Sequence, residues 1–187
     1  MSEPRLYLVR HAESEGNARK TMQGAGEYPL SEEGRAQALS AAENLCALDP
    51  LLVVASDLAR AVDTALLMAG RVDRTDPRLR ERGAGQWEGL PRSSLEAAHP
   101  GALEDDALRP DGFEDAREVV LRMRAVASEL LEHSGVVVAI THGAVLRLLE
   151  KDLNGTGTRF GHLEALVLGP GLVVVGRADL LHSGEQQ

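Results

Sequence analysis

The chain has 187 residues, of which 43% are hydrophobic and 3% aromatic, and it carries a formal net charge of -9. This length is typical of one domain, with enough Leu, Val and Ala for a complete core. An acidic chain lacks the basic face that nucleic-acid binding requires, and no apolar stretch is long enough to span a bilayer. We therefore predict one domain over residues 1–187, without nucleic-acid or membrane partners.

The start of the chain and its single cysteine bear on the cellular compartment. Residues 1–4 lead directly into an apolar run and do not resemble a signal peptide. Cys46 lies in an apolar helical pattern, so we expect a buried structural thiol there, and a single cysteine forms no intrachain disulfide. These features predict a soluble protein in the reducing cytoplasm.

Apolar runs and helical patterns alternate along the first half of the chain. The expected elements are buried strands over 5–10 and 51–55, helices over about 31–48 and 57–69, and a short strand or extended link over 71–80. Ser31 is a typical N-cap, and Ser56 and Asp57 are expected to cap the second helix in the same way. Residues 12–29 are polar and Gly-rich, which predicts a loop.

The second half continues the alternation after an irregular stretch. The expected elements are a short helix near 93–98, a long helix over about 113–133, a buried strand over 136–140, a helix over about 143–152 and a hairpin of strands over 164–168 and 172–175. Strands that alternate with helices and are apolar on both faces predict an α/β fold. We expect a mostly parallel sheet flanked by helices on both sides, with a C-terminal antiparallel hairpin strand.

The irregular stretch over residues 81–112 holds most of the remaining Gly and Pro and is expected to pass over one edge of the sheet. Within it, residues 90–112 are predicted to form a lid that selects the substrate. The lid contains the acidic run Glu104-Asp105-Asp106, which would repel highly anionic substrates.

Polar side chains follow four of the predicted strands. Arg10 and His11 end the first strand, Arg60 lies in the first turn after the second, Glu81 follows the extended link, and His142 follows the strand over 136–140. In an open α/β sheet these junctions meet at the carboxyl edge, where ligands bind. Two arginines, two histidines and helix N-termini form an anion site that suits phosphate.

These residues lie in a series of short motifs. The motifs are Leu8-Val9-Arg10-His11-Ala12-Glu13-Ser14-Glu15-Gly16-Asn17, Gln23-Gly24, Pro29-Leu30-Ser31, Gly34-Arg35-Ala36-Gln37-Ala38, Ser56-Asp57-Leu58-Ala59-Arg60-Ala61, Thr64-Ala65, Leu79-Arg80-Glu81, Trp87-Glu88-Gly89 and Thr141-His142-Gly143. Together they resemble the histidine phosphatase superfamily, which has the phosphoglycerate-mutase-like fold, over roughly residues 5–175.

The resemblance implies a catalytic role for each residue of the anion site. His11 would be the nucleophile that forms a phosphohistidine, and Glu81 would protonate the leaving oxygen and then activate water. Arg10, Arg60 and His142 would bind the phosphoryl oxygens and stabilise the charge in the transition state.

Further residues are implied as ligands of the substrate. The Asn17 side chain and the Gly143 amide would donate to the phosphoryl group, and Gln23 and Arg82 would contact the remainder of the substrate. Because arginines neutralise the phosphate charge, the resemblance implies no metal and no other cofactor. Outside this set, His162 precedes the predicted hairpin and could approach the pocket.

The chain departs from the family pattern at three places. Ala12 replaces a Gly, Glu27 stands where an Asp is common, and residues 112–115 are Gly-Phe-Glu-Asp where the family often has Gly-Glu-Ser. The last difference is expected to affect substrate contacts rather than phosphoryl transfer.

The leading prediction is a phosphatase that hydrolyses a small phosphorylated metabolite, as a monomer or a homodimer. A cofactor-dependent phosphoglycerate mutase uses the same residues, and Arg82 directly after Glu81 resembles the mutase pattern, but Ala84 stands where mutases have an aromatic residue. A protein-phosphohistidine phosphatase is a third alternative. A catalytically inactive phospho-ligand binder is a fourth, against which the complete set of core residues argues.

Overall fold

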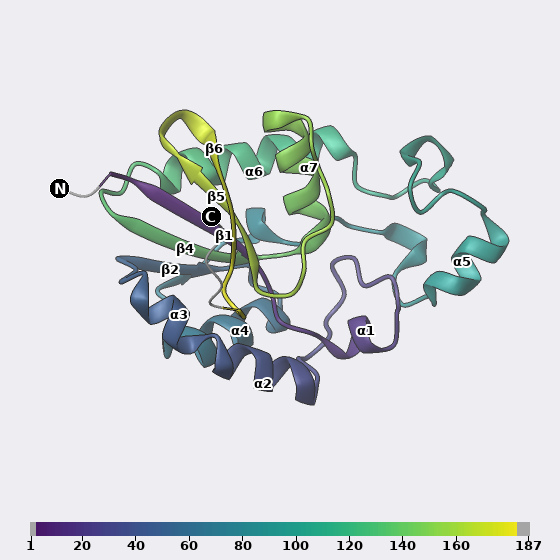
Figure 1. Cartoon of the computed structure of the whole chain (residues 1–187). Helices are drawn as coiled ribbons and strands as arrows, with labels where there is room; N and C mark the ends of the chain where they lie inside the picture. The colour runs from purple at the N-terminus through teal and green to yellow at the C-terminus, as the bar shows by residue number, and fades with distance from the viewer. Residues whose placement is uncertain (1–2, 183–187) are drawn as a thin grey trace.

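A six-stranded sheet forms the centre of the protein, and its strands run in the order β3-β2-β4-β1-β5-β6 (Figure 1). The computed structural model describes residues 3–182. The strands are β1 (Arg5–Arg10), β2 (Leu52–Ala55), β3 (Arg74–Thr75), β4 (Val136–Thr141), β5 (Glu164–Gly169) and β6 (Val173–Asp179). The first four strands of this order are parallel, whereas β5 and β6 form an antiparallel hairpin beside β1. The predicted fold class is confirmed.

Helices cover both faces of this sheet (Figure 1). One face carries α2 (Glu32–Ser40), α3 (Ala42–Ala47) and α4 (Ala59–Ala69), and the other carries α6 (Ala116–Leu130) and α7 (Gly143–Asn154). Two short helices, α1 (Glu15–Ala18) and α5 (Arg92–Ala98), lie beyond the carboxyl ends of the parallel strands. Single 3-10 turns occur at Pro77–Leu79, Gly85–Trp87, Asp106–Leu108 and Pro170–Leu172.

The central strands are mostly apolar in their interior because both of their faces are buried. In β1, Leu6 and Leu8 pack with α6 and α7, whereas Val9 packs with α2, α3 and α4. All three side chains are fully buried, since successive residues of a strand point to opposite faces. The alternation gives one hydrophobic core on each face of the sheet, and β1 and β4 are packed between the two cores.

The helix predicted over residues 31–48 is divided into α2 and α3 at Ala41. Its predicted N-cap is confirmed, because Ser31 Oγ accepts the backbone N–H of Gly34 at 3.0 Å. Ala38, Ala41 and Leu45 form the buried side of this pair of helices, which leaves Cys46 exposed. The expected buried thiol is therefore wrong, because the two helices turn a different face to the sheet.

The caps predicted for α4 are wrong. The helix begins after Leu58, without a side-chain cap, because both predicted caps have other partners. Ser56 Oγ lies 2.9 Å from His142 Nε2, and the Asp57 carboxylate accepts two hydrogen bonds of 2.7 Å from Arg80. The residues at this junction thus connect neighbouring loops at the carboxyl edge instead of closing a helix end.

The long helix α6 is shorter than predicted. It starts at Ala116, where the carboxylate of Asp115 accepts the backbone N–H groups of Arg117 and Glu118, rather than at Phe113. It ends at Leu130. None of the helices within residues 3–182 is both long enough and apolar enough to cross a membrane.

The excursion predicted after residue 81 extends past the carboxyl ends of the strands and carries α5 at its far end (Figure 1). It has a small core of its own, formed by Ala84, Trp87, Leu95 and Ala102, with Phe113 packed against it. The ring of Phe113 stands edge-on to Trp87 at 5.9 Å. The excursion is therefore a packed unit, and its role as a lid stays a prediction.

Candidate active site

His11 and His142 meet because β1 and β4 end side by side. Arg10 pairs with Thr141 at the end of the parallel ladder, so the next residue of each strand reaches the carboxyl edge together. The backbone N–H of His11 also donates to the Thr141 carbonyl at 2.9 Å. The two buried rings are 5.0 Å apart between centroids, in an edge-to-face arrangement. The register of the sheet therefore fixes the geometry of the pair.

His11 has one ring nitrogen free. Its Nδ1 lies 2.6 Å from the carbonyl oxygen of Ala12, and because a carbonyl only accepts, Nδ1 carries the proton and Nε2 keeps its lone pair. Burial, with the positive charges of Arg60 and Arg10 nearby, holds the pKa of His11 well below its usual range. A neutral imidazole with an unprotonated Nε2 is the form in which histidine acts as a nucleophile.

The fully buried Arg60 connects the second histidine to the loop before α2. Its Nε donates to Nδ1 of His142 at 3.2 Å, and its two Nη atoms donate to the carbonyl oxygens of Gly26 and Gly24 at 2.8 and 2.9 Å. Because Nδ1 of His142 accepts, its Nε2 carries the proton and donates it to Ser56 Oγ. A phosphoryl oxygen bound by His142 must therefore replace Ser56 as the acceptor. Burial and the charge of Arg60 also hold the pKa of His142 well below its usual range.

Arg10 presents a buried donor without an acceptor. Its Nη1 donates to the carbonyl oxygen of Phe160 at 2.6 Å, but its Nε–H is buried and has no hydrogen-bond partner within residues 3–182. Leaving such a donor unpaired costs about 1–3 kcal/mol. Gly143, the first residue of α7, packs on this side chain, and a Cβ there would lie 3.2 Å from Arg10 Nε. The free amide of a helix N-terminus and the unpaired guanidinium N–H thus lie together, which is an arrangement that binds anions.

Asn17 and Gln23 are positioned by Ser14 at the start of α1. Asn17 Oδ1 accepts the backbone N–H of Ser14 at 3.2 Å in a capping box, so its amide nitrogen remains available as a donor. The Ser14 hydroxyl lies 2.8 Å from Gln23 Oε1. Gln23 also packs on Gly16, where a Cβ would lie 2.6 Å from its Cδ. The small residue at position 16 therefore allows Gln23 to lie under the helix.

Glu81 faces the N-terminus of α7. Its Oε1 accepts the backbone N–H of Arg82 at 2.9 Å and its Oε2 accepts that of Ala144 at 3.4 Å. The half-buried carboxylate also lies close enough to both Arg10 and Arg60 for its charge to raise their pKa values, against the larger lowering by burial. Glu81 therefore borders the same anion site as the two arginines, where a proton donor for a leaving group is needed.

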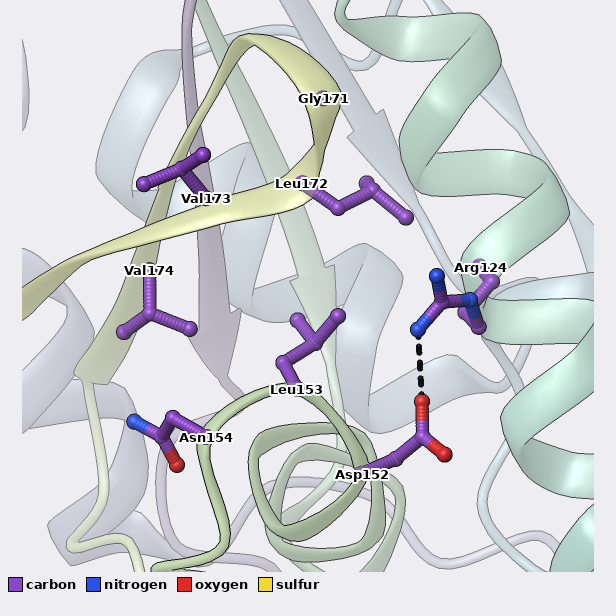
Figure 2. Close-up of a pocket in the computed structure, with 8 residues that line it drawn as sticks. All are labelled: Arg124, Asp152, Leu153, Asn154, Gly171, Leu172, Val173 and Val174. Atoms are coloured by element: carbon purple, nitrogen blue, oxygen red, sulfur yellow. Dashed lines mark hydrogen bonds and ion pairs between the residues drawn. The ribbon is translucent and has the colours of Figure 1, made fainter.

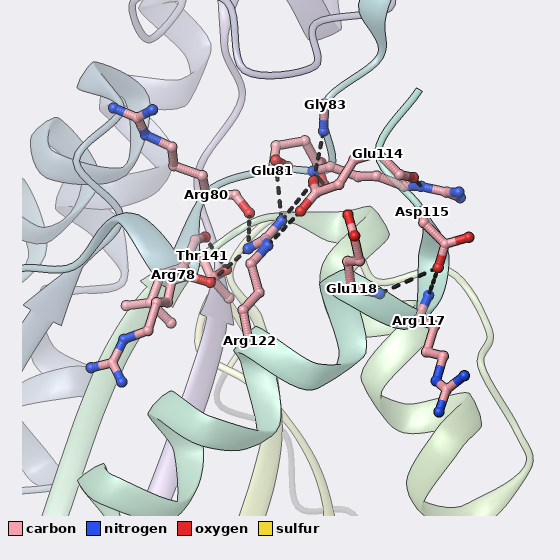
Figure 3. A network of polar contacts seen from close by, with 12 residues as sticks. Arg78, Arg80, Glu81, Gly83, Glu114, Asp115, Arg117, Glu118, Arg122 and Thr141 are labelled. Carbon is pink, nitrogen blue, oxygen red and sulfur yellow. Dashed lines mark hydrogen bonds and ion pairs between the residues drawn. The ribbon is translucent and has the colours of Figure 1, made fainter. Parts of the chain in front are cut away.

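Arg122 of α6 holds the backbone around Glu81 (Figure 3). It donates to three backbone carbonyl oxygens, those of Arg78 at 2.6 Å, Arg80 at 2.8 Å and Glu81 at 3.4 Å. The same guanidinium pairs with the Glu114 carboxylate at 2.7 Å, and Glu114 Oε2 accepts the backbone N–H of Gly83 at 2.9 Å. Arg122 lies outside the sequence motifs and was not predicted from them. The departure of residues 112–115 from the family pattern was the one feature of the sequence that pointed to this contact, because Glu114 within them pairs with Arg122.

Arg82 is bound within the excursion. Its Nε donates to the Glu114 carbonyl oxygen at 2.7 Å and its Nη1 pairs with Asp106 at 2.9 Å. The guanidinium groups of Arg82 and Arg109 lie 4.9 and 4.7 Å from the centroid of the Phe113 ring. A contact between Arg82 and the substrate stays a prediction, and in the structure the side chain connects the two ends of the excursion.

Two of the three carboxylates in the acidic run over residues 104–106 are paired with arginines. Glu104 pairs with Arg147 at 3.4 Å and with Arg159 at 3.1 Å, and Asp106 pairs with Arg82 and Arg109. The third carboxylate of the run caps the following 3-10 turn. Ion pairs with arginine thus offset two of the three charges of the run, and the repulsion of anionic substrates by it stays a prediction.

His162 lies against the candidate nucleophile. The centroids of the His162 and His11 rings are 6.4 Å apart, and Nε2 of His162 is buried without a hydrogen-bond partner in the described part of the chain. Burial and the charge of Arg10 lower the pKa of His162 to about 4. His162 therefore lies beside the candidate nucleophile, as its place before the hairpin suggested.

A separate hollow of the surface lies away from this site. A depression of about 430 Å³ lies at the other end of α7, where Arg124 and Asp152 form an ion pair of 2.7 Å (Figure 2). It contains no histidine, and no group of three or more His, Cys, Asp or Glu side chains that could hold a metal occurs within residues 3–182.

A sequence profile of the histidine phosphatase superfamily, branch 1, matches residues 6–170. The chain belongs to this superfamily. Its relatives include a phosphatase, a probable mutase and a second phosphatase. Glucosyl-3-phosphoglycerate phosphatase of Mycobacterium tuberculosis is 39% identical over 166 residues, which cover 80% of this chain and 74% of the relative. A probable phosphoglycerate mutase of Enterobacter sp. is 32% identical, with coverage of 80% and 74%. The metal-independent phosphoserine phosphatase of Arabidopsis thaliana is 35% identical, with coverage of 77% and 66%.

Solved structures of this superfamily have the same fold. The complex of a mycobacterial glucosyl-3-phosphoglycerate phosphatase with inorganic phosphate superposes with a TM-score of 0.81 at 32% identity. The superposition covers 96% of this chain and all of the other, at 100%. The phosphoglycerate-mutase-like architecture expected from the motifs is therefore confirmed.

Proposed function

We propose that the chain is a metal-independent phosphatase that hydrolyses small phosphomonoesters through a phosphohistidine at His11. The observation that carries this proposal is the buried Nε–H of Arg10, which lacks an acceptor within residues 3–182 and lies against Gly143 at the start of α7. A phosphoryl oxygen supplies that acceptor. The neutral His11, with its free Nε2, is then in place to attack phosphorus.

The reaction proceeds in two in-line steps. In the first, the Nε2 lone pair of His11 forms a bond to phosphorus while the bond to the ester oxygen breaks, and Glu81 gives its proton to the departing alcohol. In the second, Glu81 takes a proton from water, whose oxygen attacks the phosphohistidine, and inorganic phosphate leaves with His11 restored. Arg10, Arg60 and the Gly143 amide stabilise the negative charge on the equatorial oxygens in both steps.

The substrate is a small phosphorylated metabolite in this proposal. Two of the related proteins are phosphatases whose names specify glucosyl-3-phosphoglycerate and phosphoserine, and these names support a phosphomonoester of that size. A mutase activity is the second candidate, favoured by the similarity to a probable phosphoglycerate mutase. Residence in the cytoplasm and assembly as a monomer or homodimer stay predictions from the sequence.

The test measures phosphate release from a panel of phosphomonoesters that includes 3-phosphoglycerate with and without 2,3-bisphosphoglycerate. We expect hydrolysis without added metal, and a His11→Ala variant should lose it almost completely because no nucleophile remains. Acid-labile phosphate trapped on the chain, absent from His11→Ala, would identify the intermediate.

His133→Ala is the matched control, since this exposed histidine lies at the opposite edge of the sheet. An active His11→Ala protein would contradict the proposal. Conversion of 3-phosphoglycerate to its isomer, dependent on the bisphosphate and faster than phosphate release, would favour the mutase.

A further inference from the structure

Three arginines from separate segments meet at the opening of the active site. Arg92 is the first residue of α5, Arg147 lies in α7, and Arg159 lies in the loop before β5. The carboxylate of Glu104, from the excursion, bridges two of them: its Oε2 lies 3.4 Å from Arg147 Nη1 and its Oε1 lies 3.1 Å from Arg159 Nη2. We call these four residues the rim.

Glu104 forms ion pairs with Arg147 and Arg159 but not with Arg92, the third arginine of the rim. The Arg92 guanidinium forms no hydrogen bond or ion pair within residues 3–182, although the Glu104 charge acts on it. Burial and then the charge of Arg159 lower the pKa of Arg92, while Glu81 and Glu104 raise it. Three positive charges thus face one negative charge, an excess of two in a chain with a net charge of -9.

The rim adjoins the phosphate site. Arg159 directly precedes Phe160, whose carbonyl oxygen accepts the hydrogen bond of 2.6 Å from Arg10 Nη1. The backbone N–H of Arg92 donates to the carbonyl oxygen of Lys20, which follows α1, at 3.0 Å. Besides burial, the charges that lower the pKa of Arg10 come from Arg92 and Arg159, so both stand within electrostatic reach of the guanidinium that would bind the phosphoryl group. Glu81 acts on Arg10 and on Arg92 alike. A molecule held by its phosphate at Arg10 therefore extends its other end toward the rim.

The side chain that lies in the rim shows which chemistry fits there. Glu104 places one carboxylate oxygen against each of two guanidinium groups, and it is 62% exposed, so it can leave at little cost in burial. A carboxylate between guanidinium groups is a favourable charge-assisted pair. Glu104 thus occupies the position in which a carboxylate of another molecule would bind.

We propose that Arg92, Arg147 and Arg159 form a carboxylate subsite, which selects phosphomonoesters that also carry a carboxylate, and that Glu104 occupies this subsite when no substrate is bound. The proposal rests on the phosphatase function proposed above, because the phosphate must lie at Arg10 and His11. Binding exchanges one carboxylate for another, and the unpaired Arg92 contributes the additional attraction.

The test compares two ligands that differ only at the far end. In 3-phosphoglycerate the carbon distal to the phosphate is a carboxylate, and in glycerol 3-phosphate it is a hydroxymethyl group. Calorimetry on the full-length His11→Ala chain, which cannot turn either ligand over, gives both dissociation constants. We expect 3-phosphoglycerate to bind about tenfold more tightly, as one charge-assisted contact provides.

Two changes in the rim should move this preference in opposite directions. In the same His11→Ala background, Arg92→Gln combined with Arg159→Gln should reduce the ratio of the two dissociation constants to about one, and Arg159→Gln alone should reduce it in part. Glu104→Gln should increase the ratio several-fold, because it removes the internal competitor. Arg124→Gln is the matched control, since its guanidinium pairs with Asp152 at the far end of α7.

The outcomes separate this proposal from the phosphatase function. A ratio near one in the His11→Ala chain, or a ratio that the rim variants do not change, would overturn the carboxylate subsite. Hydrolysis of 4-nitrophenyl phosphate by the unmodified chain tests the phosphatase function alone, since that substrate has no carboxylate. An equal loss of affinity for both ligands in Glu104→Gln would show that Glu104 only supports the excursion, which also contradicts the proposal.

Discussion

The active site has two regions that differ in how their charges are held. The floor consists of His11, Arg60 and His142, which are at most 2% exposed; the histidines follow buried strands and Arg60 lies in the first turn of α4. The rim, in contrast, consists of exposed or half-buried arginines and one glutamate that reach the opening from other segments. In the floor, burial sets the protonation state of each histidine, whereas in the rim the charges are paired through solvent-exposed contacts.

This difference suggests a division of labour. Groups in a water-excluded site interact strongly with the charge that develops in a transition state, so the floor suits phosphoryl transfer. Exposed ion pairs contribute little to stability and exchange partners readily, so the rim suits recognition of the variable part of a substrate. Four changes of residue or condition test whether the two regions act separately.

The largest effect is expected at the edge of the floor. Glu81→Gln keeps the shape of the side chain but removes the proton that the leaving oxygen needs, so turnover of an alkyl phosphate should fall about 10²–10⁴-fold. An aryl phosphate leaves with little help from a proton and should lose far less. Equal losses of kcat for the two substrates would contradict the role of Glu81 as the general acid.

The histidines of the floor, together with the neighbouring His162, should also make stability depend on pH. The folded-state pKa values of His11, His142 and His162 all lie below the usual 6.5, so the unfolded chain binds more protons as the pH falls below that value. Stability is therefore fully present above pH 6.5 and is lost as the pH approaches 4. The titration of His162 alone should lower the free energy of unfolding by on the order of 2 kcal/mol, after allowance for solvent screening.

Urea midpoints at pH 7 and pH 4.5 measure this dependence. His162→Gln should reduce the difference between the two midpoints, because glutamine does not titrate. If the variant and the unmodified chain lose the same stability on acidification, the buried neutral state of His162 is not supported.

A smaller effect is expected from the residue that positions Glu81. Arg122→Gln removes the donors to the backbone carbonyl oxygens around Glu81, so kcat for alkyl phosphates should fall about tenfold, as a small misplacement of a catalytic group does. Aryl phosphates should be affected less. If Arg122 only supported the fold, the two kinds of substrate should lose the same activity. Arg117→Gln on the same helix is the control, since its exposed side chain makes none of these contacts.

The floor could be predicted from the sequence because each of its residues lies next to a strand or at the first turn of a helix. His11 and His142 need only the parallel register of β1 and β4 to meet, and an apolar run predicts both strands. The helix caps at Ser56 and Asp57 were also predicted from the local sequence, and these predictions were wrong. Local preference for a cap is weak, and these side chains have stronger partners that only the fold brings near.

The rim could not be predicted in this way. Arg92, Glu104 and Arg159 belong to segments without a shared periodicity, and they meet only because the excursion folds on a small core of its own. The sequence revealed the charge of the acidic run but not its partners. A formal charge without its neighbours therefore indicated repulsion, where the structure has ion pairs.

The smallest effect is expected from salt, and it distinguishes the rim from the floor most directly. Salt largely screens the interaction of exposed charges that are more than about 10 Å apart at 0.1 M, or more than about 3 Å apart at 1 M, but it screens buried groups much less. Raising the salt from 0.05 to 0.5 M should increase the KM for 3-phosphoglycerate about threefold more than that for glycerol 3-phosphate, since only the first ligand depends on the rim. Both ligands place their phosphate at Arg10, so competition by added anions at the floor affects them equally and cancels in the ratio. The kcat values should change little, because the floor is buried. A parallel change in the two KM values would mean that the rim arginines do not contact the carboxylate, even if the floor performs the chemistry as proposed.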